Sequence, residues 1–491
     1  MDIKVSAAHP ANVDALIIFL GENADSPPLD STLNQVIDNV IKAGDFSGKT
    51  GQITVLYPHE TSLASRVILV GTGEETLDTI RQAAAAALQK ARDLKAKTAA
   101  IIANGDSPQI AEAIAEGAQL GLYSYHGQKT ADKLVPLPET LTLVIGEATS
   151  SDIEAAVRAG TTIASGTNLA RDLVNLPANI CTPAYLAQAA RDIGEAVSLK
   201  VDVLGRKQME ALNMGALLGV AQGSENPPQF IIMEHNADKA EELDTIVLVG
   251  KGVTFDTGGY SLKTHDGMVG MKADMGGGGA VIGAMQAIAV LDIPLQVVGL
   301  IPASDNMVSS TAYRPQDVLT ASNGVTIEII STDAEGRLLL ADALVFAARY
   351  KPAAVVDIAT LTGACVTALG TSAAGLFSNN DSLRDMLMAA SERTTEKIWP
   401  LPLFPEYDKA IESLTADIKN TGGPRGGVGT SAAFLQRFVD YPAWAHLDIA
   451  GVAGIESLGG SSDSPYVPAK GATGFGVRLM TDFVRNWQNR S

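Results

Sequence analysis

The sequence has 491 residues, of which 46% are hydrophobic and 19% are charged, a composition typical of globular proteins and not of disordered chains. Its 55 acidic and 36 basic residues give a formal net charge of -19, which disfavours nonspecific attraction to nucleic acids and to anionic membranes. The length favours two domains, because a single hydrophobic core rarely grows beyond about 300 residues.

The stretch "MDIKVSAAHPANVD" lacks the basic segment followed by an apolar segment that a secretory signal requires. The longest apolar stretches are interrupted by Asp292, Pro294 or Asp357, so none reaches the roughly 20 residues of a membrane-spanning helix. The two cysteines, Cys181 and Cys365, make a disulfide framework implausible and favour a reducing compartment. We therefore predict a cytoplasmic protein without a membrane segment.

The first 150 residues alternate between β-rich and helical stretches, which predicts an α/β domain with helices covering a largely parallel sheet. The β-rich stretches are 15–20, 51–57, 65–71, 98–104 and 141–146, and the helical ones are 79–96 and 110–122. Gly71, Thr72 and Gly73 follow the apolar part of the third of these strands and lead into a helix, where a phosphate-binding loop could lie. Thr76 replaces the third glycine of that pattern, so a tight turn between strand and helix is the favoured interpretation.

A long helical stretch at 152–176 leads into the proline-containing segment "PANICTPAYL", and we place the domain boundary there. The predicted organisation is an N-terminal α/β domain at 1–150, a connecting helix and linker at 151–178, and a larger C-terminal α/β domain at 179–491. In the C-terminal part, the strand-like stretches are 244–250, 295–303, 325–330 and 353–364, and the helical ones are 185–196, 278–291 and 338–350. We expect a mixed central sheet flanked by helices.

Charged residues follow the first predicted strand of the C-terminal domain, in the segment "VLVGKGVTFDTGGYSLK". The strand ends at Gly250, and Lys251, Asp256 and Lys263 come shortly after it. Ligand sites of open α/β sheets lie beyond the C-terminal ends of the strands, so this segment is a candidate site. The alternative is an ordinary solvated loop, which is plausible for Lys263 alone and less so for Lys251, one residue past a buried strand.

A second candidate segment is "MKADMGGGGAV", in which Asp274 precedes the glycines Gly276 to Gly279. Asp274 could simply cap the helix that follows, as aspartate often does. Four consecutive glycines cost backbone entropy and offer no side chain for packing. We therefore expect another group to approach this backbone closely.

The third candidate segment is "TDAEGR", in which Asp333, Glu335 and Arg337 alternate with other residues. If the preceding strand continues, these three side chains share one side, because the side chains of a strand repeat every two residues. Thr332 and Glu335 also have the spacing of a helix capping box, and taken alone the sequence favours that cap at least as much.

The three segments together bring four carboxylates to the ends of strands of one predicted sheet: Asp256, Asp274, Asp333 and Glu335. Left unpaired near a dry core, these groups would repel one another and prefer protonation. Oxygen ligands without histidine fit Mg²⁺, Mn²⁺ or Zn²⁺, and none of the six histidines forms a paired metal motif. His265, the one histidine near these segments, is interpreted as a loop residue.

Four carboxylates can bind two ions about 3.5–4 Å apart, the arrangement of co-catalytic hydrolases that activate a bridging water. Lys251 could join the ligands only as a neutral amine, and Lys263 and Arg337 would supply positive charge for a developing oxyanion. No histidine or spare glutamate stands out as a general base.

Several segments resemble the leucyl aminopeptidase family of two-metal exopeptidases: "VGKGVTFDTGG", "MKADMGGGGAV", "AYRPQDVL", "STDAEGRL", "DIATLTGA", "WPLPLFPEY" and "HLDIAG". The resemblance covers the C-terminal two-thirds of the chain and extends to "RDLVNLPANICTP". It implies a cytosolic metalloprotease that removes leucine or another apolar residue from the N-terminus of peptides. It also implies a macro-like α/β fold for the N-terminal domain and a homo-hexamer built from two trimers.

The resemblance assigns roles to individual residues. The implied metal ligands are Lys251, Asp256, Asp274, Asp333 and Glu335, with Asp256 and Glu335 bridging the two ions. In the same family pattern Lys263 polarises the scissile carbonyl, and Arg337 holds a bicarbonate ion that acts as the general base. The implied substrate-binding residues are Met271, Thr360, Leu361, Gly363 and Ala450. Ser331 replaces the usual asparagine, and the glycines from Gly276 onward replace an alanine-rich stretch, but no ligand is lost.

Two other functions are consistent with parts of the sequence. A two-metal hydrolase of phosphoesters would need a basic substrate groove, and the acidic composition and the lack of arginine clusters beside the motifs argue against it. A secondary DNA-binding or regulatory role is disfavoured by the net charge of -19.

Overall fold

The structure is a computed structural model of the chain, and it describes residues 1–9, 11–22, 29, 31–58, 63–102, 105, 107–129, 136–145, 151–454 and 464–488. The chain divides into two compact units. Unit 1 is formed by the described residues of Met1–Ser165 and Ser462–Pro468, and unit 2 by those of Gly166–Ser461 and Ala469–Ser491. The long helix predicted at 152–176 is α4 (Ser151–Asn175), and the division between the units falls within it.

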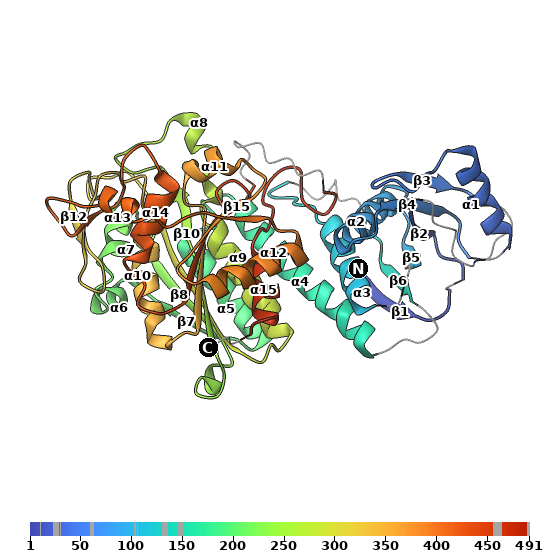
Figure 1. Ribbon diagram of the computed structural model, residues 1–491, viewed down its shortest axis with the longest axis horizontal. Helices are drawn as coiled ribbons and strands as arrows, with labels where there is room; N and C mark the ends of the chain where they lie inside the picture. The colour runs from blue at the N-terminus through green and yellow to red at the C-terminus, as the bar shows by residue number, and fades with distance from the viewer. Residues whose placement is uncertain are drawn as a thin grey trace. The chain divides into compact units, whose positions relative to one another are not determined.

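Unit 1 contains a six-stranded sheet with the order β1-β6-β5-β2-β4-β3 (Figure 1). The strands are β1 (Asp2–Ser6), β2 (Ala15–Gly21), β3 (Ile53–Leu56), β4 (Val67–Gly73), β5 (Thr98–Ile102) and β6 (Thr140–Val144). All neighbours pair parallel except β3, which runs antiparallel to β4 at the edge. The prediction of a largely parallel sheet is confirmed, although residues 103, 104 and 146 of the predicted strands lie outside the described residues.

Helices cover both faces of this sheet because alternate residues of its strands are apolar on each side. Leu33 and Ile37 of α1 (Ser31–Ala43) pack against one face. The alanine-rich helices α2 (Leu77–Asp93) and α3 (Pro108–Gly121) pack against the other. Thr76 forms a capping box with Thr79 at the start of α2, so the favoured reading of a turn between strand and helix is confirmed.

Unit 2 is built on a nine-stranded mixed sheet with the order β16-β15-β18-β14-β9-β11-β8-β7, and β10 pairs with β11. Its strands are β7 (Lys200–Leu204), β8 (Gln229–His235), β9 (Thr245–Gly250), β10 (Gly252–Asp256), β11 (Gln296–Asn306), β14 (Ala354–Ala359), β15 (Ala374–Ser378), β16 (Ile398–Pro400) and β18 (Trp444–Asp448). The central strands β11, β9, β14 and β18 are parallel, and β8, β7 and β15 join by antiparallel pairing. The predicted mixed sheet flanked by helices is confirmed.

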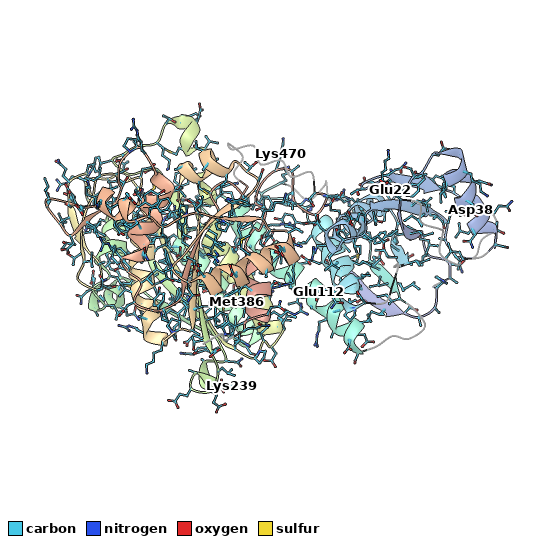
Figure 2. The ribbon with its side chains drawn as sticks, viewed as in Figure 1. Glu22, Asp38, Glu112, Lys239, Met386 and Lys470 are labelled. Atoms are coloured by element: carbon cyan, nitrogen blue, oxygen red, sulfur yellow. The ribbon has the colours of Figure 1, made fainter. Side chains whose placement is uncertain are left out.

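Two apolar clusters hold the helices of unit 2 against opposite faces of its sheet. One face is covered by α5 (Pro183–Val197), α9 (Gly276–Val290), α12 (Asp381–Thr394) and α15 (Val477–Arg485), and Met386 of α12 packs against this side (Figure 2). The other face is covered by α7 (Gly215–Val220), α10 (Gly336–Ala347) and α14 (Gly427–Gln436).

Smaller elements complete unit 2. These are α6 (Arg206–Ala211), α8 (His265–Met268), α11 (Gly363–Leu369), α13 (Pro405–Ala410) and a three-stranded sheet of β12 (Val318–Thr320), β13 (Thr326–Glu328) and β17 (Ile418–Lys419). His265 therefore begins a short exposed helix and not a plain loop. Within the described part of the chain, no helix is both long enough and apolar enough to cross a membrane.

The glycines that begin α9 are explained in part by close backbone contact. A Cβ atom on Gly277 would lie 2.0 Å from the carbonyl oxygen of Ile358 on β14. A Cβ atom on Gly276 would meet nothing closer than 3.5 Å, which is ordinary contact. Gly277 thus lets the first turn of α9 lie directly on the central strands, whereas Gly276 is not needed for that purpose.

Replacing Gly277 by alanine should therefore destabilise the chain, and replacing Gly276 should not. We expect Gly277→Ala to lower the free energy of unfolding by about 1–3 kcal/mol, the usual cost of forcing extra atoms into a packed core. Thermal or urea denaturation of the two variants measures this. Equal stability of Gly276→Ala and Gly277→Ala would contradict the explanation.

Candidate active site

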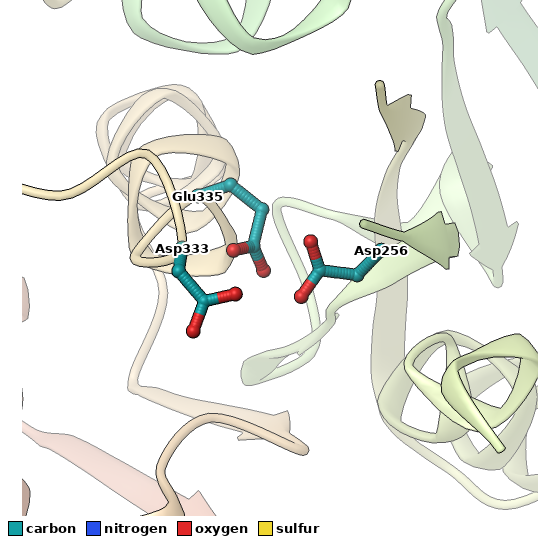
Figure 3. A group of neighbouring side chains, drawn as sticks. All are labelled: Asp256, Asp333 and Glu335. Atoms are coloured by element: carbon teal, nitrogen blue, oxygen red, sulfur yellow. The ribbon is translucent and has the colours of Figure 1, made fainter. Parts of the chain in front are cut away.

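Three carboxylates from two separate segments converge beyond the sheet of unit 2. Asp256 is the last residue of β10, and Asp333 and Glu335 lie in the turn before α10. Each offers an oxygen that lies within 4.8 Å of the others, and Figure 3 shows the three groups facing one another. Among the described residues no other group of three His, Cys, Asp or Glu side chains comes together in this way.

Lys251 joins the fourth carboxylate to this cluster. Its Nζ lies 2.8 Å from Asp274 Oδ1, 2.9 Å from Glu335 Oε1 and 2.9 Å from the carbonyl oxygen of Thr360. The lysine is buried, which favours the neutral amine, but Asp274 and Glu335 outweigh burial and raise its pKa. The structure brings these residues together as predicted, but not all of them at strand ends of one sheet. Asp274 follows a 3₁₀ helix (Met271–Ala273), and β13, the strand before Asp333 and Glu335, belongs to the separate three-stranded sheet.

Lys263 lies on the more open side of the cluster. Its Nζ is 2.8 Å from Asp256 Oδ2 and 2.5 Å from Asp333 Oδ1. Burial would lower the pKa of Lys263, but Asp256, Glu335 and Asp333 raise it above its usual value. The ammonium group therefore carries its charge at neutral pH and lies beside the carboxylates that face the cavity described below.

The surroundings move the pKa values of the four carboxylates in different directions. Burial is the largest effect on Asp256 and Asp274, and it raises the pKa of both. Partial burial also raises the pKa of Asp333 to about 6, although 37% of that side chain is accessible. Burial would raise the pKa of Glu335 too, but the charges of Lys251 and Lys263 outweigh it and lower that pKa.

The turn that carries Asp333 and Glu335 is neither of the two structures considered from the sequence. Strand β13 ends at Glu328, so Asp333, Glu335 and Arg337 do not continue a strand. The capping box is also wrong, because α10 starts after Glu335 with no side-chain hydrogen bond to its first amides. Asp333 is exposed, whereas Glu335 and Arg337 are buried.

Thr332 binds the loop after β10 and not the helix. Its hydroxyl donates to the carbonyl oxygen of Gly258 at 2.6 Å and accepts from the amide of Ser261 at 2.7 Å. Its own carbonyl oxygen accepts from Asn306 Nδ2 at 2.9 Å and from the Tyr313 hydroxyl at 2.8 Å. Thr332 therefore fixes the turn of Asp333 and Glu335 relative to the loop of Asp256, a role that the sequence analysis missed.

Asp274 does not cap α9, which was the alternative for that residue. The cap position of α9 is Met275, and it makes no side-chain hydrogen bond. The Oδ1 atom of Asp274 instead accepts from the Thr360 hydroxyl at 2.8 Å in addition to Lys251. Both partners belong to the candidate site.

Arg337 presents an unused donor beside the same cluster. Its Nη1 donates to the carbonyl oxygen of Asn420 at 2.7 Å, while its Nε has no hydrogen-bond partner among the described residues. The guanidinium is buried, and burial lowers its pKa to about 10. A buried guanidinium with a free N–H is suited to an anionic ligand.

A cavity of about 410 Å³ opens over the cluster. The structure places every candidate site residue around it: Lys251, Asp256, Lys263, Met271, Asp274, Asp333, Glu335, Arg337, Thr360, Leu361, Gly363 and Ala450. The lining residues that were not assigned a role from the sequence are Ser331, Ala334, Thr362, Val366, Thr421 and Gly427. Thr421 and Gly427 flank the glycine-rich stretch "GGPRG", which was the one signal that could have indicated them.

The donor set of this site fits divalent cations. Asp274 Oδ2 and Glu335 Oε2 are buried and have no hydrogen-bond partner among the described residues. Buried carboxylate oxygens nearly always have a partner, so two unused ones within a group of four carboxylates suit cation binding. Carboxylate oxygens are also the preferred ligands of Mg²⁺ and Mn²⁺.

Comparison with known sequences shows the family of this chain. Residues 168–481 match the sequence model of the cytosol aminopeptidase family, catalytic domain, and residues 17–132 match that of the N-terminal domain of the same family. The chain belongs to the cytosol aminopeptidase family. It is therefore an aminopeptidase by family, a hydrolase with the two-unit α/β fold described above.

Individual members of the cytosol aminopeptidase family align over nearly the whole chain. A probable cytosol aminopeptidase of Roseiflexus castenholzii is 43% identical over 499 residues, and one of Geobacter sulfurreducens is 40% identical over 499 residues, each covering 99% of both chains. Among solved structures, a tomato leucine aminopeptidase mutant has a TM-score of 0.86 at 35% identity, covering 99% of this chain and 96% of that one. The bottromycin maturation enzyme BotP in complex with Mn has a TM-score of 0.84 at 35% identity, covering 96% and 99%.

Removing the Thr332 hydroxyl should weaken metal binding without removing a ligand. Thr332→Val keeps the shape of the side chain but loses the bonds to Gly258 and Ser261, so the loops that carry the carboxylates are no longer held together. We expect the dissociation constant for Mn²⁺ to rise by about 10–100-fold, the usual effect of losing a partner that orients ligands. Isothermal titration calorimetry measures it, with Thr332→Ser as the control that keeps the hydroxyl. Unchanged affinity in Thr332→Val would show that the hydroxyl does not position the ligands.

Proposed function

We propose that the chain is a two-metal aminopeptidase that removes leucine or another apolar residue from the N-terminus of peptides. The observation that carries this proposal is the convergence of one lysine and four carboxylates, two with unused buried oxygens, at the edge of a cavity of about 410 Å³. The family membership supports it, and so does the likeness to a leucine aminopeptidase structure.

Five side chains would hold the ions: Lys251, Asp256, Asp274, Asp333 and Glu335. Two bound divalent ions supply an activated water and a Lewis acid for amide hydrolysis. We propose Mn²⁺ or Zn²⁺, with Mg²⁺ also compatible with the oxygen donors, and the manganese complex of BotP supports a divalent ion. Lys251 would bind as the neutral amine, which neighbouring dications favour.

Lys263 and Arg337 would act on the substrate side of the ions. The Lys263 ammonium, beside Asp256 and Asp333, would stabilise negative charge that develops on the scissile carbonyl oxygen. Arg337 would use its free Nε to hold a bicarbonate ion, which supplies the base that no side chain of the cavity provides. Lys263 would thus act on the scissile carbonyl, and Arg337 on the bicarbonate ion.

The remaining lining residues suit an apolar N-terminal side chain. Met271, Thr360, Gly363 and Ala450 would surround that side chain, and Leu361 would offer a backbone contact. Val366 also lines the cavity and adds apolar surface. Small and apolar linings of this kind select side chains by size and hydrophobicity.

The same proposal includes assembly and location. We propose a cytoplasmic homo-hexamer built from two trimers, acting on peptides. Relatives that are named for the cytosol and that align over 99% of this chain support the location. Neither a basic substrate groove nor a basic surface for DNA is indicated by the acidic composition, so no second function is proposed.

Hydrolysis of leucyl-p-nitroanilide in the presence of Mn²⁺ or Zn²⁺ tests the proposed activity. The unmodified chain should release p-nitroaniline. Asp333→Ala and Glu335→Ala should each lower kcat/KM by more than about 100-fold, because removing a metal ligand should lower activity more than removing a residue that only orients a ligand. Asp238→Ala, which changes an exposed carboxylate outside the cavity, is the matched control. No cleavage with either metal would refute the activity, and full activity in both cavity variants would refute the site.

The role of Arg337 can be tested separately. Arg337→Met should lower kcat by about 10²–10⁴-fold, the usual contribution of a general base, and should abolish any stimulation by added bicarbonate. Arg337→Lys keeps the charge but not the planar donor geometry, so we expect only partial recovery. Measuring kcat against bicarbonate concentration decides this, and a kcat for Arg337→Met equal to that of the unmodified chain would exclude the role.

A further inference from the structure

Another buried carboxylate, that of Asp448, lies beside the cavity wall and does not belong to the candidate metal cluster. Asp448 is the last residue of β18, and its side chain is fully buried. Its Oδ1 accepts from the amides of Leu361, Thr362 and Ala450 at 3.2, 3.4 and 3.2 Å, and its Oδ2 accepts from the Thr362 hydroxyl at 2.6 Å. All four donors are neutral, and three of them are backbone amides.

The donors to Asp448 come from the residues that line the cavity. Leu361 and Thr362 follow β14, and Ala450 follows β18, so one carboxylate joins the ends of two neighbouring strands. The Thr362 hydroxyl also accepts from the amide of Cys365 and so caps α11. The Asp448 side chain therefore links the two segments, after β14 and after β18, that form this wall of the cavity.

The same carboxylate reaches the metal ligands through one peptide group. The amide of Leu361 donates to Asp448, and the carbonyl oxygen of Thr360, on the opposite edge of that peptide plane, accepts from Lys251 Nζ at 2.9 Å. Asp448 and Lys251 therefore hold the plane from both sides. The Thr360 hydroxyl then donates to Asp274, which continues the connection to the carboxylates.

We propose that Asp448 is a positioning residue that couples the substrate side-chain pocket to the metal ligands by fixing the segment from Thr360 to Thr362. The proposal rests on the proposed aminopeptidase function and adds to it a residue that determines specificity. Without the carboxylate, three backbone amides and one hydroxyl would lose their partner at once. The segment from Thr360 to Thr362 would then no longer fix the position of the pocket wall relative to Lys251.

The chain offers a matched control for this idea. Asp342 is also a fully buried carboxylate that accepts from two backbone amides, those of Leu217 and Ser322, at 2.9 and 2.8 Å. Neither donor lines the cavity. Replacing Asp342 should therefore cost stability in the same way as replacing Asp448, but it should not move the pocket wall or the ligands.

The test compares two readouts in Asp448→Ala. We expect the preference for leucyl- over alanyl-p-nitroanilide, measured as the ratio of the two kcat/KM values, to fall by about tenfold. The reason is that the pocket wall that contacts the larger leucyl side chain is no longer held in place. We also expect the dissociation constant for Mn²⁺, measured by calorimetry, to rise by about tenfold, because Lys251 loses a fixed neighbour. Asp342→Ala should lower the melting temperature but leave both values unchanged.

Two further variants keep the test decisive if Asp448→Ala does not fold. Asp448→Asn retains one acceptor oxygen for the amides and can donate to the Thr362 hydroxyl, so both values should largely recover. Thr362→Val removes the 2.6 Å bond to Asp448 together with the bond from the Cys365 amide, and it should lower the leucine preference, whereas Thr362→Ser keeps both bonds and should not. The proposal would be overturned if Thr362→Val had the leucine preference of the unmodified chain. It would also be overturned if Asp342→Ala changed the leucine preference and the dissociation constant for Mn²⁺ as much as Asp448→Ala does.

The two readouts also separate this proposal from the proposed function. Calorimetry with Mn²⁺ does not require peptide hydrolysis. If the unmodified chain binds Mn²⁺ but cleaves neither anilide, the aminopeptidase activity is refuted. The metal affinities of Asp448→Ala and Asp342→Ala then still decide whether Asp448 positions the ligands.

Discussion

The convergence of four carboxylates, three of them buried, at one edge of a sheet is the constraint on which this structure depends. Such a group is unfavourable unless positive charge lies close by. The chain supplies it pairwise, with Lys251 between Asp274 and Glu335 and Lys263 between Asp256 and Asp333. Asp274 Oδ2 and Glu335 Oε2 still have no hydrogen-bond partner among the described residues, so the two lysines do not pair with every carboxylate oxygen. These two oxygens are free to bind a cation, which makes the cluster a candidate metal site.

The fold satisfies this constraint by bringing distant segments to one place and holding them there. Parallel strands carry their C-terminal ends to the same edge of the nine-stranded sheet, which is why the end of β10 and the loop after β14 can meet. The turn before α10 is held at the same place by the bonds of Thr332 to the loop after β10. Close contacts then fix the distances. Gly277 lets α9 lie against Ile358, and Thr332 joins two loops that are more than 70 residues apart in the sequence.

The sequence predicted β9, β11, β13, β14 and the candidate residues around the cavity, because charged residues directly after apolar stretches are a local signal, but it missed β10, which carries Asp256, and β18. It could not predict which partner each polar side chain takes. Thr332 and Glu335 have the spacing of a cap, yet the Thr332 hydroxyl binds Gly258 and Ser261, partners that become available only after β10 and β13 are in place. Strand β1, the small sheet with β17 and the role of Asp448 were missed for the same reason, since each depends on pairing between segments far apart in the chain.

Buried polar residues of β14 and β18 fix how these two strands pair. On β18, His446 lies two residues before Asp448 and therefore on the same face, and it pairs with Asp357 of β14 at 2.5 Å. Trp444 donates to the other oxygen of Asp357 at 2.7 Å. Burial would lower the pKa of His446, but Asp357 outweighs it and raises that pKa. A shift of β18 by one residue would turn all three side chains to the opposite face and leave Asp357 buried without partners. The buried pair thus specifies the register of β14 and β18, and that register places Asp448 beneath the amides of Leu361 and Thr362.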